Sequence, residues 1–96
     1  ELTALSIDAL KVLKAYQRRW VGTLLMDEAE RRIAQRSPLA GIGVCLTPDY
    51  GPAMILYVRR GYIPDGRGVY QNQRHCQHGD LVRLDDELIL YLTKKL

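Results

Sequence analysis

Apolar residues along this chain follow two spacings, one helical and one typical of strands. From Val21 to Arg36 they stand at positions 21, 24, 25, 29 and 33, with charged residues mostly between them. This spacing predicts an amphipathic helix. Short apolar runs at Ala9–Leu13 and Ile42–Leu46 predict strands before and after that helix. The order strand, helix, strand predicts a βαβ unit.

Proline and glycine divide the middle of the chain. Pro38 separates the first helix from the strand that follows it, because proline disfavours a helical conformation in the preceding residue. Thr47–Pro52 predicts a turn and a helix start, with Pro52 near the first helical position. We expect a short helix over Ala53–Arg60 that ends at Gly61.

The remaining apolar positions predict strands. Tyr62–Ile63 and Gly68–Tyr70 lie on either side of a turn at Pro64–Gly66. Asp86–Thr93 is the last predicted strand. Its leucines at 88, 90 and 92 fall on one face, and Ile89 and Tyr91 fall on the other. Apolar residues on both faces predict a strand that is buried on both sides.

Tyr16–Thr23 places a basic, glycine-containing turn directly before the first helix. The first N–H groups of a helix have no intrahelical acceptor, and the helix dipole leaves about half a positive charge at that end. Gly22 permits close approach of a ligand, and Arg18 and Arg19 add full charges. The stretch therefore favours an anion site of the phosphate type. A solvated helix start is the alternative.

Two motifs in this order give the chain a family resemblance. The first consists of Gln17, Arg18, Arg19 and Gly22, and the second of Ala53, Leu56, Tyr57, Gly61 and Tyr62. With these motifs the chain resembles the GNAT superfamily of acetyl-CoA-dependent N-acetyltransferases. The resemblance covers nearly the whole chain but only the carboxyl-terminal part of a usual family domain. Trp20 departs from the pattern, because the family has its first glycine there.

The resemblance implies a fold and an activity. The fold is an α/β, acyl-CoA N-acyltransferase-like mixed sheet flanked by helices, with the amino-terminal elements missing. Residues 1–96 would be one partial GNAT-like domain, the acetyl-CoA-binding half. The activity is direct transfer of an acetyl group from acetyl-CoA to a primary amine. No metal is implied.

Site residues follow from the resemblance. The pyrophosphate of coenzyme A would be held by the backbone amides of Arg18, Arg19, Trp20, Val21, Gly22 and Thr23. Val12 and Leu13 would offer main-chain groups to the pantetheine arm, between the fourth and fifth strands of the family. The Val12 amide could also polarise the thioester carbonyl. Tyr57 matches the hydroxyl that protonates the departing thiolate, although a tyrosine between Leu56 and Val58 can also simply pack.

Trp20 defines the main alternative to an active enzyme. A glycine at this position allows close approach to the phosphates, whereas an indole adds bulk and a fixed Cβ. We expect weaker coenzyme A binding than in a Trp20→Gly variant. A GNAT-like pseudoenzyme, or a CoA-binding interaction module without turnover, is the alternative function. The acceptor amine and the general base are not assigned by the sequence.

Length and composition set the remaining expectations. Ninety-six residues make one domain with a modest core. A sheet edge at Ala9–Leu13 would invite a partner, so we expect either a homo-oligomer or an amino-terminal segment that completes the sheet. No apolar run approaches the roughly 20 residues of a membrane span and no signal peptide is present, which predicts a cytoplasmic protein without membrane contact.

Two other features of the sequence bear on possible ligands, the stretch His75–His78 and the recurring arginine pairs. His75–His78 contains three soft ligands in four residues, but a second ligand pair at zinc-site spacing is missing, so no metal is expected. The net charge is +3 and arginine pairs recur, which would suit nucleic acid. Interspersed acidic residues favour a solvated, salt-bridged helix face instead. We therefore expect no nucleic-acid partner.

Overall fold

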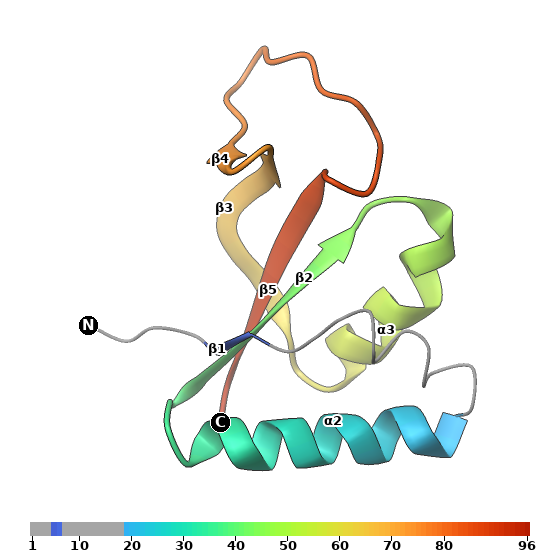
Figure 1. Ribbon diagram of the computed structural model, residues 1–96, viewed down its shortest axis with the longest axis vertical. Helices are drawn as coiled ribbons and strands as arrows, with labels where there is room; N and C mark the ends of the chain where they lie inside the picture. Colours follow the sequence, from blue (N-terminus) through green and yellow to red (C-terminus); the bar gives the residue numbers. More distant parts are fainter. Residues whose placement is uncertain (1–4, 7–18) are drawn as a thin grey trace.

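The computed structural model describes residues 5–6 and 19–96, with side chains from residue 23 onward. Figure 1 shows the elements in chain order. They are β1 (Leu5–Ser6), α2 (Arg19–Ala34), β2 (Leu39–Cys45), the 3-10 helix η1 (Pro48–Tyr50), α3 (Gly51–Arg59), β3 (Ile63–Gln71), β4 (Arg74–His75) and β5 (Ile89–Lys95). The predicted mixed α/β class is confirmed. The strand predicted at Ala9–Leu13 lies outside the described residues.

Five strands form one sheet in the order β1-β2-β5-β3-β4. β1 is parallel to β2, and the other neighbouring pairs are antiparallel. The β2–β5 ladder runs from Leu39 opposite Lys95 to Cys45 opposite Ile89. β5 follows the other described strands in the chain but lies between β2 and β3.

Helix α2 confirms the first predicted helix, with both ends shifted by two residues. Beyond Ala34 the chain turns, because the Ile33 carbonyl accepts both the Arg36 and Ser37 N–H groups at 2.8 Å. The buried Ser37 hydroxyl then accepts the Leu39 N–H at 3.1 Å and donates to the Leu39 carbonyl at 2.9 Å. These hydrogen bonds set the direction in which β2 begins.

Helix α3 confirms the second predicted helix and its glycine stop. Gly61 has φ of +100°, and its N–H donates to the Val58 carbonyl at 3.0 Å. The Tyr62 N–H donates to the Tyr57 carbonyl, also at 3.0 Å. This pair of bonds is a Schellman motif. Its usual apolar contact is made by the Tyr57 and Tyr62 rings, whose centroids lie 6.3 Å apart.

β3 is one strand where the sequence predicted two strands and a turn. Its pairing with β5 is irregular between Pro64 and Val69, where Gly66 and Gly68 have φ of +87° and +75°. The prediction of a turn is therefore replaced by a bulged strand. β3 and β4 form a hairpin that was not predicted, closed by Asn72 and Gln73 at positive φ.

The predicted start of the last strand is wrong. β5 begins at Ile89, because the residues before it form a turn in which the Asp85 carboxylate accepts the Glu87 N–H at 3.0 Å. The Leu88 N–H also donates to the Asp85 carbonyl. Burial on both faces is also not observed: Leu92 is buried, whereas Ile89 and Tyr91 on the other face are only partly buried.

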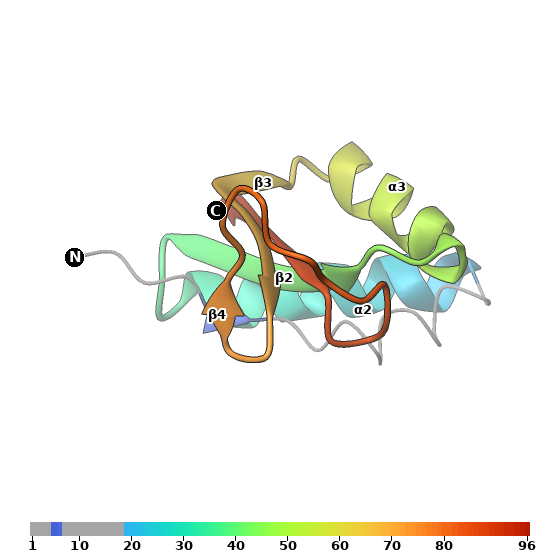
Figure 2. The same ribbon diagram turned by 90° about the horizontal axis from the view of Figure 1, so that it is seen from above.

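The core lies on one face of the sheet. Its buried cluster is Met26, Ile33, Ala40, Ile42, Val44, Ala53, Tyr57, Tyr62 and Leu92. The three β2 members alternate along the strand, so they share one face. Because α2 and α3 both contribute to this cluster, both helices cover that face, to the lower right of the strands in Figure 1. Figure 2 shows α2 beneath β2 and α3 displaced toward the side of β3.

Candidate functional site

The predicted phosphate-binding stretch lies at the beginning of α2. The helix starts at Arg19, so Gly22 is inside the helix and does not belong to a turn before it. In an α-helix each N–H from the fifth residue onward bonds to the carbonyl four residues earlier. The Thr23 N–H is therefore used within the helix, and the first four amides, those of Arg19, Trp20, Val21 and Gly22, are the ones that can face an anion. Arg18 lies outside the described residues.

In the chain, α2 lies between the two parallel strands β1 and β2. Leu5 lies opposite Ala40, and Ser6 lies opposite Gly41. Among the described residues, β2 has no strand partner on this side after Gly41, whereas on its other side pairing with β5 continues to Cys45. Val12 and Leu13, the predicted pantetheine contacts, lie outside the described residues.

Tyr57 is enclosed by the core. Its exposed fraction is 0%, and its hydroxyl has no hydrogen-bond partner in the described part of the chain. Burial, followed by the nearby Tyr50, raises the pKa of Tyr57 to about 12. A buried hydroxyl without a partner costs about 1–3 kcal/mol. Tyr57 therefore packs in the core, which is the alternative to a catalytic role that the sequence left open. Its hydroxyl is a hydrogen-bond donor with no described acceptor.

Polar groups gather at the end of β2 and the beginning of α3. Cys45 is buried, and its thiol donates to the Asp86 carbonyl at 3.3 Å. Burial raises the pKa of Cys45, and a hydrogen bond with the Tyr50 side chain acts in the opposite direction. The hydroxyl oxygen of Thr47 is buried without a described partner. Tyr50 and Cys45 were not predicted as site residues; the seven-residue spacing from Tyr50 to Tyr57 is the sequence signal that points to Tyr50.

A carboxylate at Glu30 fixes the two helices against β5. Its Oε2 accepts hydrogen bonds from Arg60 Nε at 3.1 Å and from the Tyr62 hydroxyl at 2.9 Å. Its Oε1 accepts from Arg60 Nη2 at 2.8 Å and Lys94 Nζ at 3.0 Å. Burial alone would raise the pKa of Glu30, but these hydrogen bonds lower it below the ordinary value. The network holds the C-terminus of α3, and so positions Tyr57.

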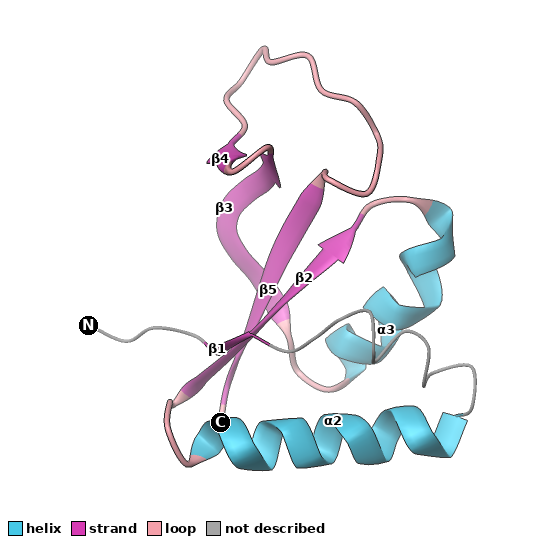
Figure 3. Cartoon of the chain, in the orientation of Figure 1, coloured by secondary structure: helices cyan, strands magenta, loops and turns pink. Residues whose placement is uncertain are grey.

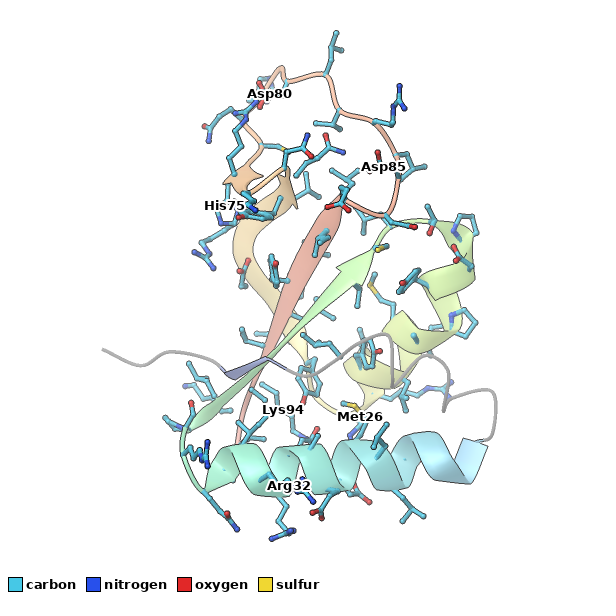
Figure 4. All side chains as sticks on the ribbon, in the orientation of Figure 1. Met26, Arg32, His75, Asp80, Asp85 and Lys94 are labelled. Carbon is cyan, nitrogen blue, oxygen red and sulfur yellow. The ribbon has the colours of Figure 1, made fainter. Side chains whose placement is uncertain are left out.

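Side chains of α2 and β5 either face the space between helix and sheet or face solvent. In Figure 4, Met26 from α2 and Lys94 from β5 point into the space between the helix and the sheet, whereas Arg32 points away. Arg32 instead pairs with Glu28 at 2.8 Å, and Arg31 pairs with the same carboxylate at 2.6 Å. The predicted salt-bridged, solvated face of this helix is present.

The loop between β4 and β5 projects beyond the sheet (Figure 3). His75, at its beginning, packs edge-on against Tyr70 with ring centroids 5.0 Å apart. In the described residues no three His, Cys, Asp or Glu side chains gather as a metal site would require. Leu81 is fully exposed, and Leu84 is also exposed. This loop therefore presents apolar side chains and no ligand cluster.

The chain matches no protein-family model, no curated protein and no solved structure. Neither helix of the described part has the length and apolar content needed to span a bilayer.

Proposed function

We propose that this chain is a GNAT-type domain that transfers an acetyl group from acetyl-CoA to a primary amine. Tyr57 carries the proposal: its enclosed, unpartnered hydroxyl lies on the helix that follows the second parallel strand. The resemblance assigns proton donation to this residue. Tyr50, directly before α3, is close enough to contribute to the raised pKa of Tyr57.

The connection from β1 through α2 to β2 also supports the proposal. It joins two parallel strands by a helix whose first turn carries Arg19, Trp20 and Val21. Free amides and the positive helix end there suit a pyrophosphate. The side of β2 facing β1, which lacks a described strand partner after Gly41, is where the resemblance puts the pantetheine arm. Peptide groups on a strand edge can bind an extended amide chain.

The proposed reaction is a direct transfer. The amine nitrogen bonds to the acetyl carbon, and the carbonyl π electrons move to oxygen, where the resemblance supplies the Val12 amide. The carbon–sulfur bond then breaks, and the thiolate takes a proton from the Tyr57 hydroxyl. The nitrogen loses its extra proton to a base or to water. Because the Tyr57 hydroxyl is fully enclosed, this proton transfer requires the core around it to open toward the thiolate.

The pKa of Tyr57 also gives weight to the second candidate, a CoA-binding domain without turnover. A pKa of about 12 lies well above the ordinary thiol value of about 8.5, so proton transfer from this hydroxyl to a thiolate is uphill. The cationic nitrogen formed during attack can lower the pKa of a nearby tyrosine. If the site does not place the amine near Tyr57, coenzyme A binds and is not deacetylated.

One experiment separates the two candidates. Calorimetry measures binding of coenzyme A, and chromatography measures coenzyme A release from acetyl-CoA with a panel of primary amines. Chromatography is preferred, because the half-exposed Cys76 would consume a thiol reagent. We expect Tyr57→Phe to lower kcat about 100-fold with little change in binding. Tyr91→Phe, on the other face of the sheet, is the matched control.

Each outcome of this experiment has a defined meaning. Binding with amine-dependent release that needs Tyr57 supports the acetyltransferase. Binding without release from the unmodified chain supports the interaction module. Absence of binding at millimolar coenzyme A refutes both.

A further inference from the structure

The outer face of α3 is apolar although it is exposed. Ile55 and Val58 lie on this face with exposed fractions of 53% and 55%, and Pro52 beside them is also exposed. The inner face of the helix is apolar as well, because Ala53 and Tyr57 are buried in the core. A helix that is apolar all round is normally buried. In Figures 1 and 2, α3 lies at the edge of the molecule, so its outer face is free to receive a partner.

The charges at the two ends of α3 indicate which partner fits. The outer face of α2 carries Glu28 paired with Arg31 and Arg32, as a solvated helix does. In contrast, α3 contains one charged residue, Arg59, which is exposed and has no ion pair with any described residue. Asp49, directly before the helix in η1, is also exposed and has no described ion pair. An apolar face with an anion at one end and a cation at the other is complementary to a second copy of itself.

Helical spacing places a gap and a knob along one edge of this face. Gly51 and Val58 are seven residues, about two turns, apart, so they lie along the same edge, on one side of Ile55. A Cβ at Gly51 would meet no atom within 4 Å. This edge therefore has an open space at one end and an exposed valine at the other.

The opposite edge of the face carries the two charges. Pro52 and Arg59 are also seven residues apart and lie along this edge. Asp49 is three residues before Pro52 and belongs to the 3-10 helix, a geometry in which residues three apart are eclipsed. Asp49 therefore extends the edge beyond Pro52, with Arg59 at its other end.

We propose that the outer face of α3 is the interface of a homodimer, in which the two copies of the helix pack antiparallel across a twofold axis beside Ile55. In this arrangement each edge meets the same edge of the other copy in the reverse direction. Val58 of each copy then fills the gap at Gly51 of the other. Arg59 of each copy lies beside Asp49 of the other, so two ion pairs flank the apolar contact.

The expected association is weak because the helix is short. Nine residues at 1.5 Å each make α3 about 13 Å long, and a contact of this length is at the small end of specific interfaces. We expect a Kd of about 10–100 μM. The interface differs from the Ala9–Leu13 edge, where the sequence predicted a partner. It also does not depend on acetyl transfer, so its failure would leave the proposed function untouched.

Sedimentation equilibrium from about 1 μM to about 1 mM protein tests the dimer. Ile55→Asp should raise the Kd at least about tenfold, because it brings two carboxylates together at the twofold axis. Gly51→Leu should have a similar effect by filling the gap, and its helical φ of −55° with open surroundings leaves the monomer able to fold. Leu24→Asp is the matched control, because it charges an exposed leucine on α2 and should leave the Kd within about twofold. Circular dichroism checks that each variant is folded.

Charge reversal tests the antiparallel pairing. Arg59→Glu and Asp49→Lys should each raise the Kd about three- to tenfold, because each places like charges together twice in the dimer. The double variant Asp49→Lys/Arg59→Glu should return the Kd to within about twofold of wild type, since the pairs are restored with their signs exchanged. Arg36→Glu makes the same charge change at an exposed site beyond α2 and should have no effect.

Three results would overturn the inference. A wild type that stays monomeric at about 1 mM would leave the outer face of α3 to a different protein or to another segment of a longer chain. A dimer that Ile55→Asp and Gly51→Leu do not weaken more than Leu24→Asp must use another surface. A double charge reversal that dissociates as readily as the single variants excludes the antiparallel arrangement.

Discussion

Replacing Glu30 by glutamine tests whether the buried carboxylate holds the two helices on the sheet. The amide keeps the size of the side chain but removes its charge. It leaves Arg60 and Lys94, whose side chains are 15% and 24% exposed, facing a neutral group. Removing one partner of a buried ion pair typically costs 3–5 kcal/mol.

The structure reduces this cost for Glu30→Gln. Arg60 keeps a second ion pair, with Asp27 at 2.7 Å, although Asp27 is 59% exposed and so screened by water. Lys94 has a flexible side chain that can move toward solvent. We therefore expect a loss of about 2–3 kcal/mol in the free energy of unfolding. For a domain of this size, that lowers Tm by roughly 10–20 °C.

Urea unfolding followed by circular dichroism measures the loss. Glu28→Gln is the matched control, because it makes the same change on the same helix but affects only the exposed pairs with Arg31 and Arg32. Exposed pairs contribute little to stability, so this variant should unfold close to the wild-type midpoint. Indistinguishable midpoints for Glu30→Gln and Glu28→Gln would refute the assignment of the network as structurally important.

The pH dependence of stability provides a second test of the role of Glu30. Its pKa is lowered in the folded protein, so the stability it contributes is present above the unfolded value near 4.3 and is lost as pH falls through the folded value. The difference in stability between wild type and Glu30→Gln should therefore be full at pH 7 and shrink below about pH 4. A difference that is the same at pH 3 and pH 7 would contradict this.

Four other substitutions have defined outcomes. Gly43→Ala should destabilise the protein by about 1 kcal/mol in urea unfolding, because a Cβ there would lie 3.0 Å from atoms of Ile89 and Tyr91. Gly51→Ala is the control, because a Cβ there meets nothing within 4 Å and should not destabilise the protein. Met26→Ala should cost about 2–4 kcal/mol, because the side chain is fully buried, and a loss below about 1 kcal/mol would argue against that packing. Trp20→Gly should lower the Kd for coenzyme A in calorimetry, and equal Kd values would count against steric interference by the indole.

The helices were predictable because their signals are local. Apolar spacing located α2, and proline followed by glycine located α3. Gly61 ends α3 through a positive φ, a conformation that glycine adopts at little cost. The ends of the strands were not predictable, because they depend on partners far away in the chain. Lys95, for example, is part of β5 because it lies opposite Leu39.

The site was predictable in part. The motifs indicated Tyr57, but nothing local shows that it would be fully enclosed. Glu30 and Lys94 are 64 residues apart and carry no shared pattern, so their contact emerges only from the fold. The hairpin at Asn72 and Gln73 was missed for a different reason. Glycine is the usual second residue of such a turn, and glutamine occupies that place.

The position of β5 decides how the sheet can come apart. β2 and β3 have no backbone pairing with each other in the sheet and are joined only through β5. Each β5 N–H can bond to only one of the two neighbouring strands, so its hydrogen exchange requires that ladder to open. Opening of both ladders leaves only the short β1–β2 and β3–β4 pairs. The β2–β5 ladder also spans most of the described chain in sequence, so its closure is a slow, non-local step of folding. The domain should consequently fold and unfold as one cooperative unit, with the amides of β5 among the last to exchange.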